Sequence, residues 1–158
     1  MESKDIIQRL GMQSHPEGGF YKETYRSAET MTLGNGKTRN VSTAIYFLLE
    51  NDNMSALHRI KSDEMWFFHQ GQPLEIVYIQ NGKLYTIILG NDINKGEVPQ
   101  AWVPANTWFG SRVKDRKGFS LVSCTVAPGF DFADFEMADR NELIQLYPRL
   151  ETIITRFT

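Results

Sequence analysis

The sequence contains a single cysteine, Cys124, so no disulfide can form within the chain. Nothing therefore indicates an oxidising compartment. No apolar run approaches the roughly 20 residues that a membrane-spanning helix needs. The first residues, MESKDIIQRL, lack the apolar centre of a signal peptide. These features predict a soluble, cytoplasmic protein that has no membrane partner.

Clustered positive charge is also missing from the sequence. Lysine and arginine total 17 against 19 aspartates and glutamates, which gives a formal net charge of -2. A nucleic-acid binder needs a basic patch or stripe to neutralise phosphates, and no such stripe is found here. The composition therefore argues against a nucleic-acid partner.

The composition that remains is that of an ordinary globular protein. Hydrophobic residues make up 41% and charged residues 23% of the 158 positions, while aromatic residues reach 12%. This aromatic content suits the packing of a barrel or stacking on a planar ligand. The length suits one domain with a real core, so we predict a single domain over residues 1–158.

Short β-prone runs separated by turn residues dominate the chain. They predict strands at residues 20–26, 41–49, 57–60, 64–71, 74–79, 83–89, 100–103, 107–113 and 119–126. Asn81-Gly82 is typical of a tight hairpin turn. Helices are expected only at the ends, over residues 3–10 and after Asp139 and Pro148. The pattern predicts an all-β sandwich or barrel with short terminal helices.

The stretch LHRIKSDEMWFFHQG, residues 57–71, is the centre of this pattern. It places His58 and Glu64 on two strands joined by a short polar turn. Because side chains alternate along a strand, Glu64, Trp66 and Phe68 share one face. A histidine and a carboxylate that point inward from adjacent strands would form a polar spot inside an apolar barrel. Such a spot is suited to binding a small molecule.

Four stretches together resemble the cupin superfamily, and within it the small single-domain PEGGF-type cupins of unassigned activity. His58, Glu64 and Gly71 match the first cupin motif, in which Ile60 replaces the second histidine. The other stretches are HPEGGFYKETYRS (15–27), PQAWVPANTWFGSR (99–112) and CTVAPGFDFADFEMA (124–138). The resemblance covers nearly the whole chain. It implies a double-stranded β-helix, also called a jelly-roll barrel, with an internal pocket and a homodimeric assembly.

The same resemblance argues against a metal cofactor. Most metal-binding cupins use three histidines and a glutamate, but here Ile60 and Phe109 stand at two of the histidine positions. One imidazole and one carboxylate hold a divalent ion weakly, since three or four protein ligands are usual. We expect no metal, although a weak site at His58 and Glu64 stays open.

Acid–base chemistry is the leading hypothesis for these residues. Metal-free cupins that epimerise nucleotide-linked sugars use a histidine base and a tyrosine acid, and the likeness to them is one of fold. Here His58 is the candidate base, Glu64 or Asp63 its orienting partner, and Tyr21 the first candidate acid, with Tyr46 or Tyr78 as alternatives. The structural alternative is that Glu64 accepts hydrogen bonds from loop amides and that His58 is a satisfied core residue.

Several other side chains are candidates for contacting a ligand. Aromatic rings can stack on a sugar or base, although a tryptophan inside a barrel more often fills space. An arginine can bind an anionic group. The candidate ligand-binding residues are Trp66, Tyr46, Trp108, Arg112 and Phe68. The double glycine Gly18-Gly19 indicates either a bulge or a loop that brings Glu17 and Tyr21 to the pocket border.

Three possible functions follow from these residues. The first is a metal-independent isomerase or epimerase that acts on a sugar-like or other small polar substrate. The second is a module that binds or senses a metabolite without catalysis, and a metal-dependent oxygenase is the third possibility.

The apolar strand predicted at residues 41–49 is either buried on both faces or part of a dimer contact.

Overall fold

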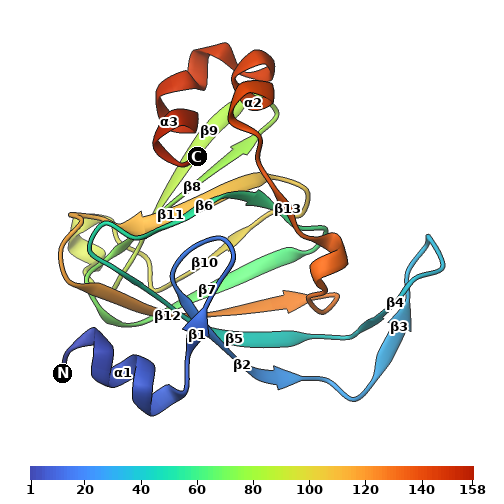
Figure 1. Ribbon diagram of the computed structural model, residues 1–158, viewed down its shortest axis with the longest axis horizontal. Coiled ribbons are helices and arrows are strands. Elements are labelled where there is room, and N and C mark those ends of the chain that lie inside the picture. The colour runs from blue at the N-terminus through green and yellow to red at the C-terminus, as the bar shows by residue number, and fades with distance from the viewer.

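Two antiparallel sheets packed face to face form most of the molecule, whose computed structural model describes all residues 1–158 (Figure 1). The first sheet contains, in spatial order, β1 (Gln13–Ser14), β2 (Phe20–Arg26), β5 (Thr43–Glu50), β12 (Phe119–Ala127), β7 (Asp63–Gly71) and β10 (Gln100–Val103). The second contains β13 (Glu136–Met137), β6 (Met54–Arg59), β11 (Trp108–Val113), β8 (Leu74–Gln80) and β9 (Lys83–Leu89). The hairpin β3 (Thr30–Thr32) and β4 (Thr38–Asn40) extends from the first sheet.

This arrangement confirms the predicted all-β jelly roll with short helices. The helices are α1 (Ser3–Leu10), α2 (Arg140–Leu146) and α3 (Glu151–Arg156), with 3₁₀ turns η1 (Ile93–Lys95), η2 (Phe132–Asp134) and η3 (Pro148–Leu150). No helix is long and apolar enough to cross a bilayer. Asn81 and Gly82 both have positive φ angles, 52° and 73°, as the predicted hairpin turn requires.

One expectation about strand placement is wrong. His58 on β6 and Glu64 on β7 are close in the sequence, but their strands belong to different sheets. The turn between them carries the chain from one sheet to the other. The two side chains therefore approach the interior from opposite walls rather than from neighbouring strands.

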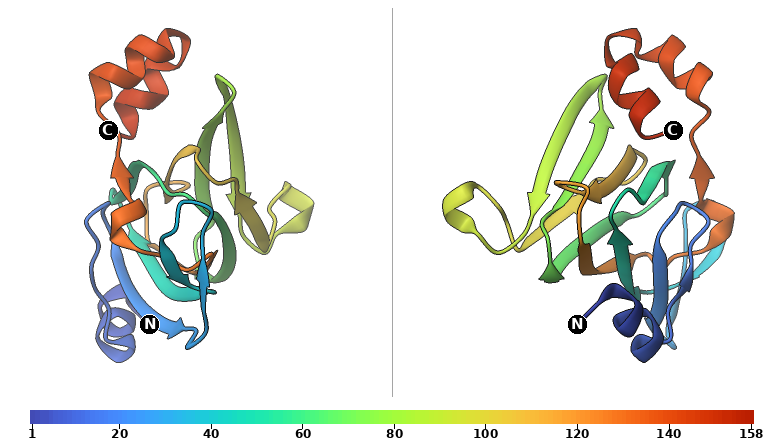
Figure 2. Two further views of the ribbon diagram at one scale, coloured as in Figure 1. Left: turned by 90° about the vertical axis from the view of Figure 1, so that its right-hand side faces the viewer. Right: turned by 60° about the vertical axis from the view of Figure 1, so that its left-hand side comes forward.

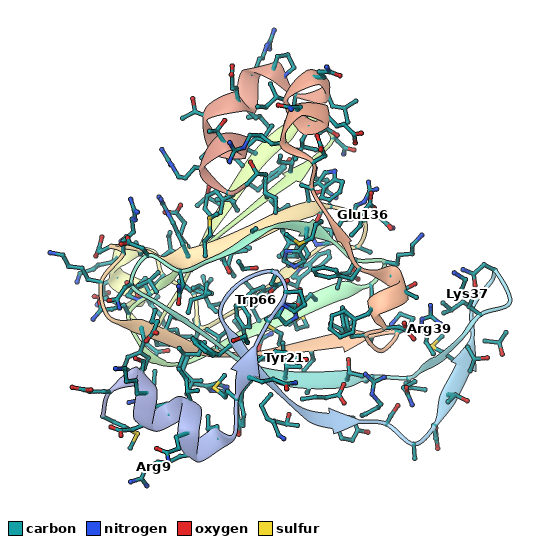
Figure 3. The ribbon with its side chains drawn as sticks, viewed as in Figure 1. Arg9, Tyr21, Lys37, Arg39, Trp66 and Glu136 are labelled. Atoms are coloured by element: carbon teal, nitrogen blue, oxygen red, sulfur yellow. The ribbon has the colours of Figure 1, made fainter.

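The main core fills the space between the sheets. It consists of inward-facing residues of both sheets, namely Phe47, Leu49, Ile60, Trp66, Leu74, Ile76, Leu89, Val103, Phe109, Val113, Val122, Cys124 and Val126. Figure 3 shows Trp66 in this space between the two sheets. Strand alternation sends every second side chain of a strand into this core, as the sequence pattern predicts.

Helices cover the outer face of each sheet. Helix α1 packs on the first sheet through a cluster that includes Ile6, Leu48 and Leu121. The C-terminal helices cover the second sheet around Leu57 and Phe157. In both views of Figure 2, α1 and the C-terminal helices lie at opposite ends of the molecule.

Strand β5 lies between β2 and β12, with one face in the main core and the other towards α1. Leu48 and Leu49 point to opposite faces, and neither is exposed. Burial on both faces thus accounts for the apolar sequence of this strand.

Candidate functional site

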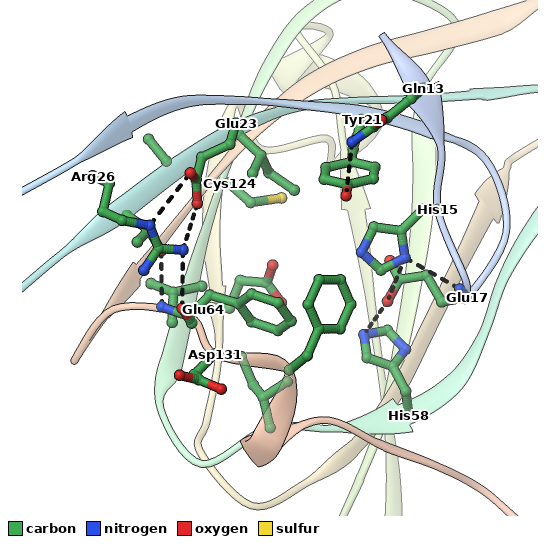
Figure 4. Close-up of a pocket in the computed structure, with 17 residues that line it drawn as sticks. Gln13, His15, Glu17, Tyr21, Glu23, Arg26, His58, Glu64, Cys124 and Asp131 are labelled. Carbon is green, nitrogen blue, oxygen red and sulfur yellow. Dashed lines mark hydrogen bonds and ion pairs between the residues drawn. The ribbon is translucent and has the colours of Figure 1, made fainter. Parts of the chain in front are cut away.

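A cavity of about 490 Å³ opens between the two sheets, and side chains of both sheets line it (Figure 4). Its volume lies in the range of small-molecule sites. Strands β1, β2, β5, β7 and β12 of the first sheet contribute, together with β6 of the second sheet and the segment around η2. The lining residues are Gln13, His15, Glu17, Tyr21, Glu23, Arg26, Thr43, Ala44, Ile45, His58, Ile60, Glu64, Cys124, Val126, Phe130, Asp131 and Phe132.

An ion pair between Glu17 and His58 occupies one wall of this cavity. The Nε2 atom of His58 lies 2.7 Å from the Glu17 carboxylate, and its Nδ1 lies 2.7 Å from the carbonyl oxygen of Ala56. Both ring nitrogens therefore face acceptors, which favours the doubly protonated imidazolium. The side chains are only 3% and 9% exposed, so this pair lies in a low-dielectric environment.

The pKa values of the pair shift in the directions that this geometry requires. Burial alone would raise the pKa of Glu17, but the charge and hydrogen bond of His58 outweigh burial and lower it below its ordinary value. Burial alone would lower the pKa of His58, but Glu17 and the Ala56 carbonyl raise it. The carboxylate and the imidazolium thus stabilise each other's charged forms.

Two glycines bring Glu17 into the barrel. Gly18 and Gly19 have φ angles of 111° and 75°, a region that residues with side chains rarely adopt. A Cβ atom at Gly18 would lie 2.0 Å from the carbonyl oxygen of Met54. This close approach lets the amide of Ala56 donate a hydrogen bond of 2.8 Å to the backbone oxygen of Glu17. The loop is thereby fixed to β6, beside His58.

His15 lies next to this ion pair but stays neutral. Its Nδ1 accepts a hydrogen bond of 3.1 Å from the backbone N–H of Glu17, which places the proton of the neutral ring on Nε2. Burial lowers the pKa of His15, and the nearby charge of His58 lowers it further, against the opposing effect of Glu17. The ring packs edge-on against Tyr21, with centroids 4.7 Å apart. Its free nitrogen points into the cavity (Figure 4).

A second carboxyl group, that of Glu64, lines the cavity from β7 and forms no ion pair. Burial raises its pKa, and the negative charge of Glu17 raises it further, to about 8, against smaller opposing effects of His58 and Cys124. Glu64 is therefore protonated at neutral pH. The neighbouring Cys124 thiol has its pKa raised well above the ordinary value, mainly by burial, so it is a neutral group as well.

Ion pairs also hold the entrance of the cavity. Arg26 binds Glu23 at 2.6 Å and also donates to Asn40 and to the backbone oxygen of Phe130. Arg39 of β4 makes two hydrogen bonds to Asp134 of η2, at 2.8 and 2.9 Å. These contacts hold the segment around η2 at the entrance, where Phe132 both lines the cavity and is 52% exposed.

The structure brings three of the predicted site residues together. His58, Glu64 and Tyr21 all line the cavity. Trp66 is buried in the main core between Phe47 and Phe109, and Phe68 packs against that core. Neither of these two is among the residues that line the cavity, so both fill space behind it.

The other three predicted ligand-binding residues point away from the interior, and their placement in the pocket is wrong. Tyr46 lies on the outer face of β5, against the cluster beneath α1, because its neighbour Ile45 takes the inward position. Trp108 packs towards the C-terminal helices, with the Arg59 guanidinium 4.3 Å from its ring centroid. Arg112 lies on the same outer face and pairs with Glu75 at 3.2 Å.

Glu17 was predicted only for the pocket border, and His15 was not among the predicted site residues. Glu64 or Asp63 was the expected partner of His58, but the hydrogen-bonded partner is Glu17. The double glycine was the signal for this contact, since it indicates a close backbone approach. No local pattern shows how far the loop that carries His15 folds over the barrel.

The residues present do not fit the metal centre found in many cupins. Ile60 and Phe109 are buried apolar side chains at two positions where such a centre needs histidine. Both nitrogens of His58 already have hydrogen-bond partners. No group of three or more histidine, cysteine, aspartate or glutamate side chains is arranged to hold a metal ion.

Comparison with known proteins identifies the family. A family model described as the cupin superfamily (DUF985) matches residues 4–138. An uncharacterised protein of Saccharomyces cerevisiae is 34% identical over 145 residues, which cover 83% of this chain and 72% of the yeast protein. A hypothetical protein from Leishmania major has a solved structure that is 37% identical with a TM-score of 0.94, covering 100% of this chain and 99% of its own. A protein from Shewanella oneidensis is 40% identical with a TM-score of 0.92, covering 100% and 98%. With its jelly-roll barrel and this family match, the chain belongs to the DUF985 family of the cupin superfamily.

Proposed function

We propose that this cupin is a metal-independent acid–base enzyme. It is an isomerase or epimerase that moves a proton at a carbon next to a carbonyl group of a small polar molecule. The cavity between the sheets is the site of the reaction.

The observation that carries the proposal is the pair of carboxyl groups in one cavity with pKa values shifted in opposite directions. Glu17 is held ionised by His58, whereas Glu64 is held protonated with a pKa of about 8. Environments that separate two titratable groups in this way are typical of an acid and a base that act together.

The ion pair supplies the base. Both nitrogens of His58 are engaged, so the atom free to accept a proton is a carboxylate oxygen of Glu17. In the first step the Glu17 carboxylate takes the substrate's α-proton, and the electrons of the broken C–H bond form the C=C bond of an enol. His58 keeps its own proton, and its positive charge balances the negative charge of Glu17 before the transfer.

The neutral carboxyl group supplies the acid. As the enol forms, the carbonyl oxygen gains negative charge and takes the proton of Glu64, which becomes a carboxylate. A protonated carboxylic acid in an apolar site is a strong hydrogen-bond donor to such an oxygen. Tyr21 is the candidate second donor, because its oxygen accepts a hydrogen bond of 3.0 Å from Gln13 and its own proton stays free. A proton returned to the other face of the same carbon completes an epimerisation. A proton delivered to the neighbouring carbon completes an isomerisation.

Deuterium exchange tests this function directly. The purified protein is incubated in heavy water with a panel of small hydroxy-aldehydes and hydroxy-ketones, and deuterium uptake at carbon is followed by NMR. We expect uptake with the wild type and a loss of 100-fold or more, on the order of one catalytic group, in Glu17→Gln and in Glu64→Gln. Equal uptake by the wild type and Glu17→Gln would sink the proposal.

A binding module without catalysis is the second candidate. The observation in its favour is that the polar groups of the cavity are already held by one another, as in the Gln13–Tyr21 and Arg26–Glu23 contacts. Such a preformed pocket can bind a ligand with little rearrangement. Tight binding of a hydroxy-carbonyl compound with no deuterium uptake over hours would favour this candidate.

A further inference from the structure

We propose that the ligand of this cavity is an uncharged molecule, a small hydroxy-carbonyl or amide compound without phosphate, carboxylate or ammonium groups. The charge of the ligand follows from the cavity alone, and only the carbonyl group rests on the proposed function. The inference narrows the substrate class, since it excludes sugar phosphates, nucleotide-linked sugars and simple organic acids.

Each charged side chain inside the cavity already has a counter-charge. Glu17 pairs with His58 at 2.7 Å and Glu23 with Arg26 at 2.6 Å. Asp131 lies at the entrance, where it is 46% exposed to water and 3.9 Å from Arg39, whose hydrogen bonds go to Asp134. The lining residues include no lysine and no further arginine. The cavity thus presents no free cation to a ligand, and behind its entrance it presents no free anion.

A charged ligand would therefore have to break one of these pairs or enter without a partner. Removing an unpaired charge from water costs several kcal/mol, and separating a buried pair leaves a second uncompensated charge. An anion would lie close to the Glu17 and Glu23 carboxylates, and a cation close to His58 and Arg26. Neither an anion nor a cation therefore finds a favourable place among the ion-paired side chains of the cavity.

The groups that stay free for a ligand are uncharged. Tyr21 has a free hydroxyl proton, and His15 directs its Nε2–H into the cavity beside it (Figure 4). Glu64 forms no ion pair and adds a third neutral group on the opposite side. Apolar side chains complete the walls, namely Ile45, Ile60, Val126, Phe130 and Phe132. Neutral donors together with apolar surface suit a hydroxylated compound that has one apolar face.

The three histidines of the chain are reporters for a direct test. His15 and His58 line the cavity, whereas His69 lies on the outer face of β7, where it bonds to Ser123. Side-chain ¹H–¹⁵N spectra of the wild type are recorded with three probes that share a two-carbon hydroxylated skeleton. The probes are glycolamide, which is uncharged, glycolate, which is an anion, and ethanolamine, which is a cation.

We expect glycolamide to shift the signals of His15 and His58 but not that of His69, with a Kd at least about tenfold lower than those of the two charged probes. A glycolate or ethanolamine Kd equal to or below that of glycolamide would overturn the proposal. A spectrum that none of the three probes changes at His15 or His58 would overturn it as well.

Two variants test the cause of this selectivity. Glu17→Gln removes the counter-charge that keeps the buried His58 protonated, so a glycolate carboxylate can take its place together with a proton. We therefore expect the preference to reverse in favour of glycolate at about pH 5.5, below the ordinary pKa of histidine. Glu23→Gln removes the counter-charge of Arg26 at the entrance, so it should also favour glycolate. The Glu23 side chain is 42% exposed, so this variant affects the fold less. If both variants keep the wild-type preference, ion pairing does not set the selectivity and the proposal falls.

The outcome also separates this inference from the proposed function. Selective glycolamide binding without deuterium uptake in any hydroxy-carbonyl compound would keep the ligand class and remove the enzyme. Deuterium uptake in a phosphorylated or carboxylated substrate, lost in Glu64→Gln, would keep the enzyme and remove the ligand class.

Discussion

At the scale of single residues, the Glu17–His58 pair should contribute strongly to stability. His58→Ala leaves a carboxylate that is 9% exposed without its counter-charge, and breaking such a buried pair costs about 3 kcal/mol or more. Urea unfolding at neutral pH measures this loss. The double variant Glu17→Gln/His58→Ala should recover part of it because no unpaired charge is left. If His58→Ala lowered the free energy of unfolding by less than about 1 kcal/mol, the result would contradict the ion pair.

Glu64 should make stability depend on pH in a specific direction. Its pKa rises from an ordinary 4.5 to about 8 in the folded protein, so between these values the native state holds a proton that the unfolded state has lost. This contribution to stability is full below about pH 4.5 and is lost as pH rises towards 8, by about 1.4 kcal/mol per pH unit.

Glu64→Gln keeps the shape of the side chain but has no proton to lose. The wild type should therefore lose stability relative to Glu64→Gln as pH rises from about 5 to about 8. Urea unfolding of the two proteins at several pH values measures the difference. Parallel pH curves would show that Glu64 is ionised throughout this range.

His58 and Glu64 were predicted because they match the first cupin motif, and Tyr21 because it lies on the strand that follows the double glycine. Glu17 was predicted only for the pocket border because a loop residue lacks the periodicity of a strand, and its position depends on contacts with β6. Trp108 and Arg112 were misplaced for a related reason. Both lie on β11, but alternation along a strand does not say which of its two faces points to the core.

At the scale of elements, the loop that carries Glu17 depends on the absence of a side chain at Gly18. Gly18→Ala would place a Cβ 2.0 Å from a backbone oxygen at a φ of 111°. We expect a loss of about 2–4 kcal/mol in stability, from steric overlap and backbone strain, together with loss of deuterium exchange.

Gly34→Ala is the matched control for this loop. A Cβ there meets nothing within 4 Å, and Gly34 has no positive φ. Thermal unfolding of both variants measures the contrast, and we expect Gly34→Ala to melt like the wild type. Equal melting temperatures for the two variants would contradict the close approach of the loop to β6.

The bounds of most strands followed from the sequence, because turn residues such as Asn81-Gly82 mark them. The assignment of strands to sheets did not follow. A short polar turn like the one between β6 and β7 serves equally well in a hairpin and in a crossover between sheets. Burial of β5 on both faces also depends on α1, which is far from it in the sequence.

The pair between Arg39 and Asp134 should hold the η2 segment over the cavity. Asp134→Asn removes the charge of an acceptor whose pKa is lowered chiefly by the hydrogen bond from Arg39. We expect faster amide hydrogen exchange in residues 130–137 and little change elsewhere. The control is Asp52→Asn, which breaks the exposed Arg116 pair at 2.9 Å on another surface. Unchanged exchange in the segment would show that its aromatic contacts suffice to hold it.

At the scale of the whole molecule, homodimer formation stays a prediction. The strand first considered for the contact, β5, is covered on both faces. Apolar side chains that stay exposed on the first sheet include Trp102 of β10, which is 52% exposed and lies opposite Met65 of β7.

The cavity joins the two halves of the barrel, so its occupant should stabilise the whole molecule. Glu17 and Tyr21 come from the side of the first sheet and His58 from the second. A ligand at 100 times its Kd adds about 2.7 kcal/mol to the free energy of unfolding, or about 5–10 °C in melting temperature for a domain of this size.

We expect this shift with the uncharged compound that binds most tightly in the histidine assay. Hydrogen exchange should slow on the inner strands of both sheets, since a ligand that contacts both walls opposes their separation. Val126→Phe narrows the cavity from β12 and should abolish the shift. Protection confined to one sheet, or an equal shift in Val126→Phe, would place the ligand outside the cavity.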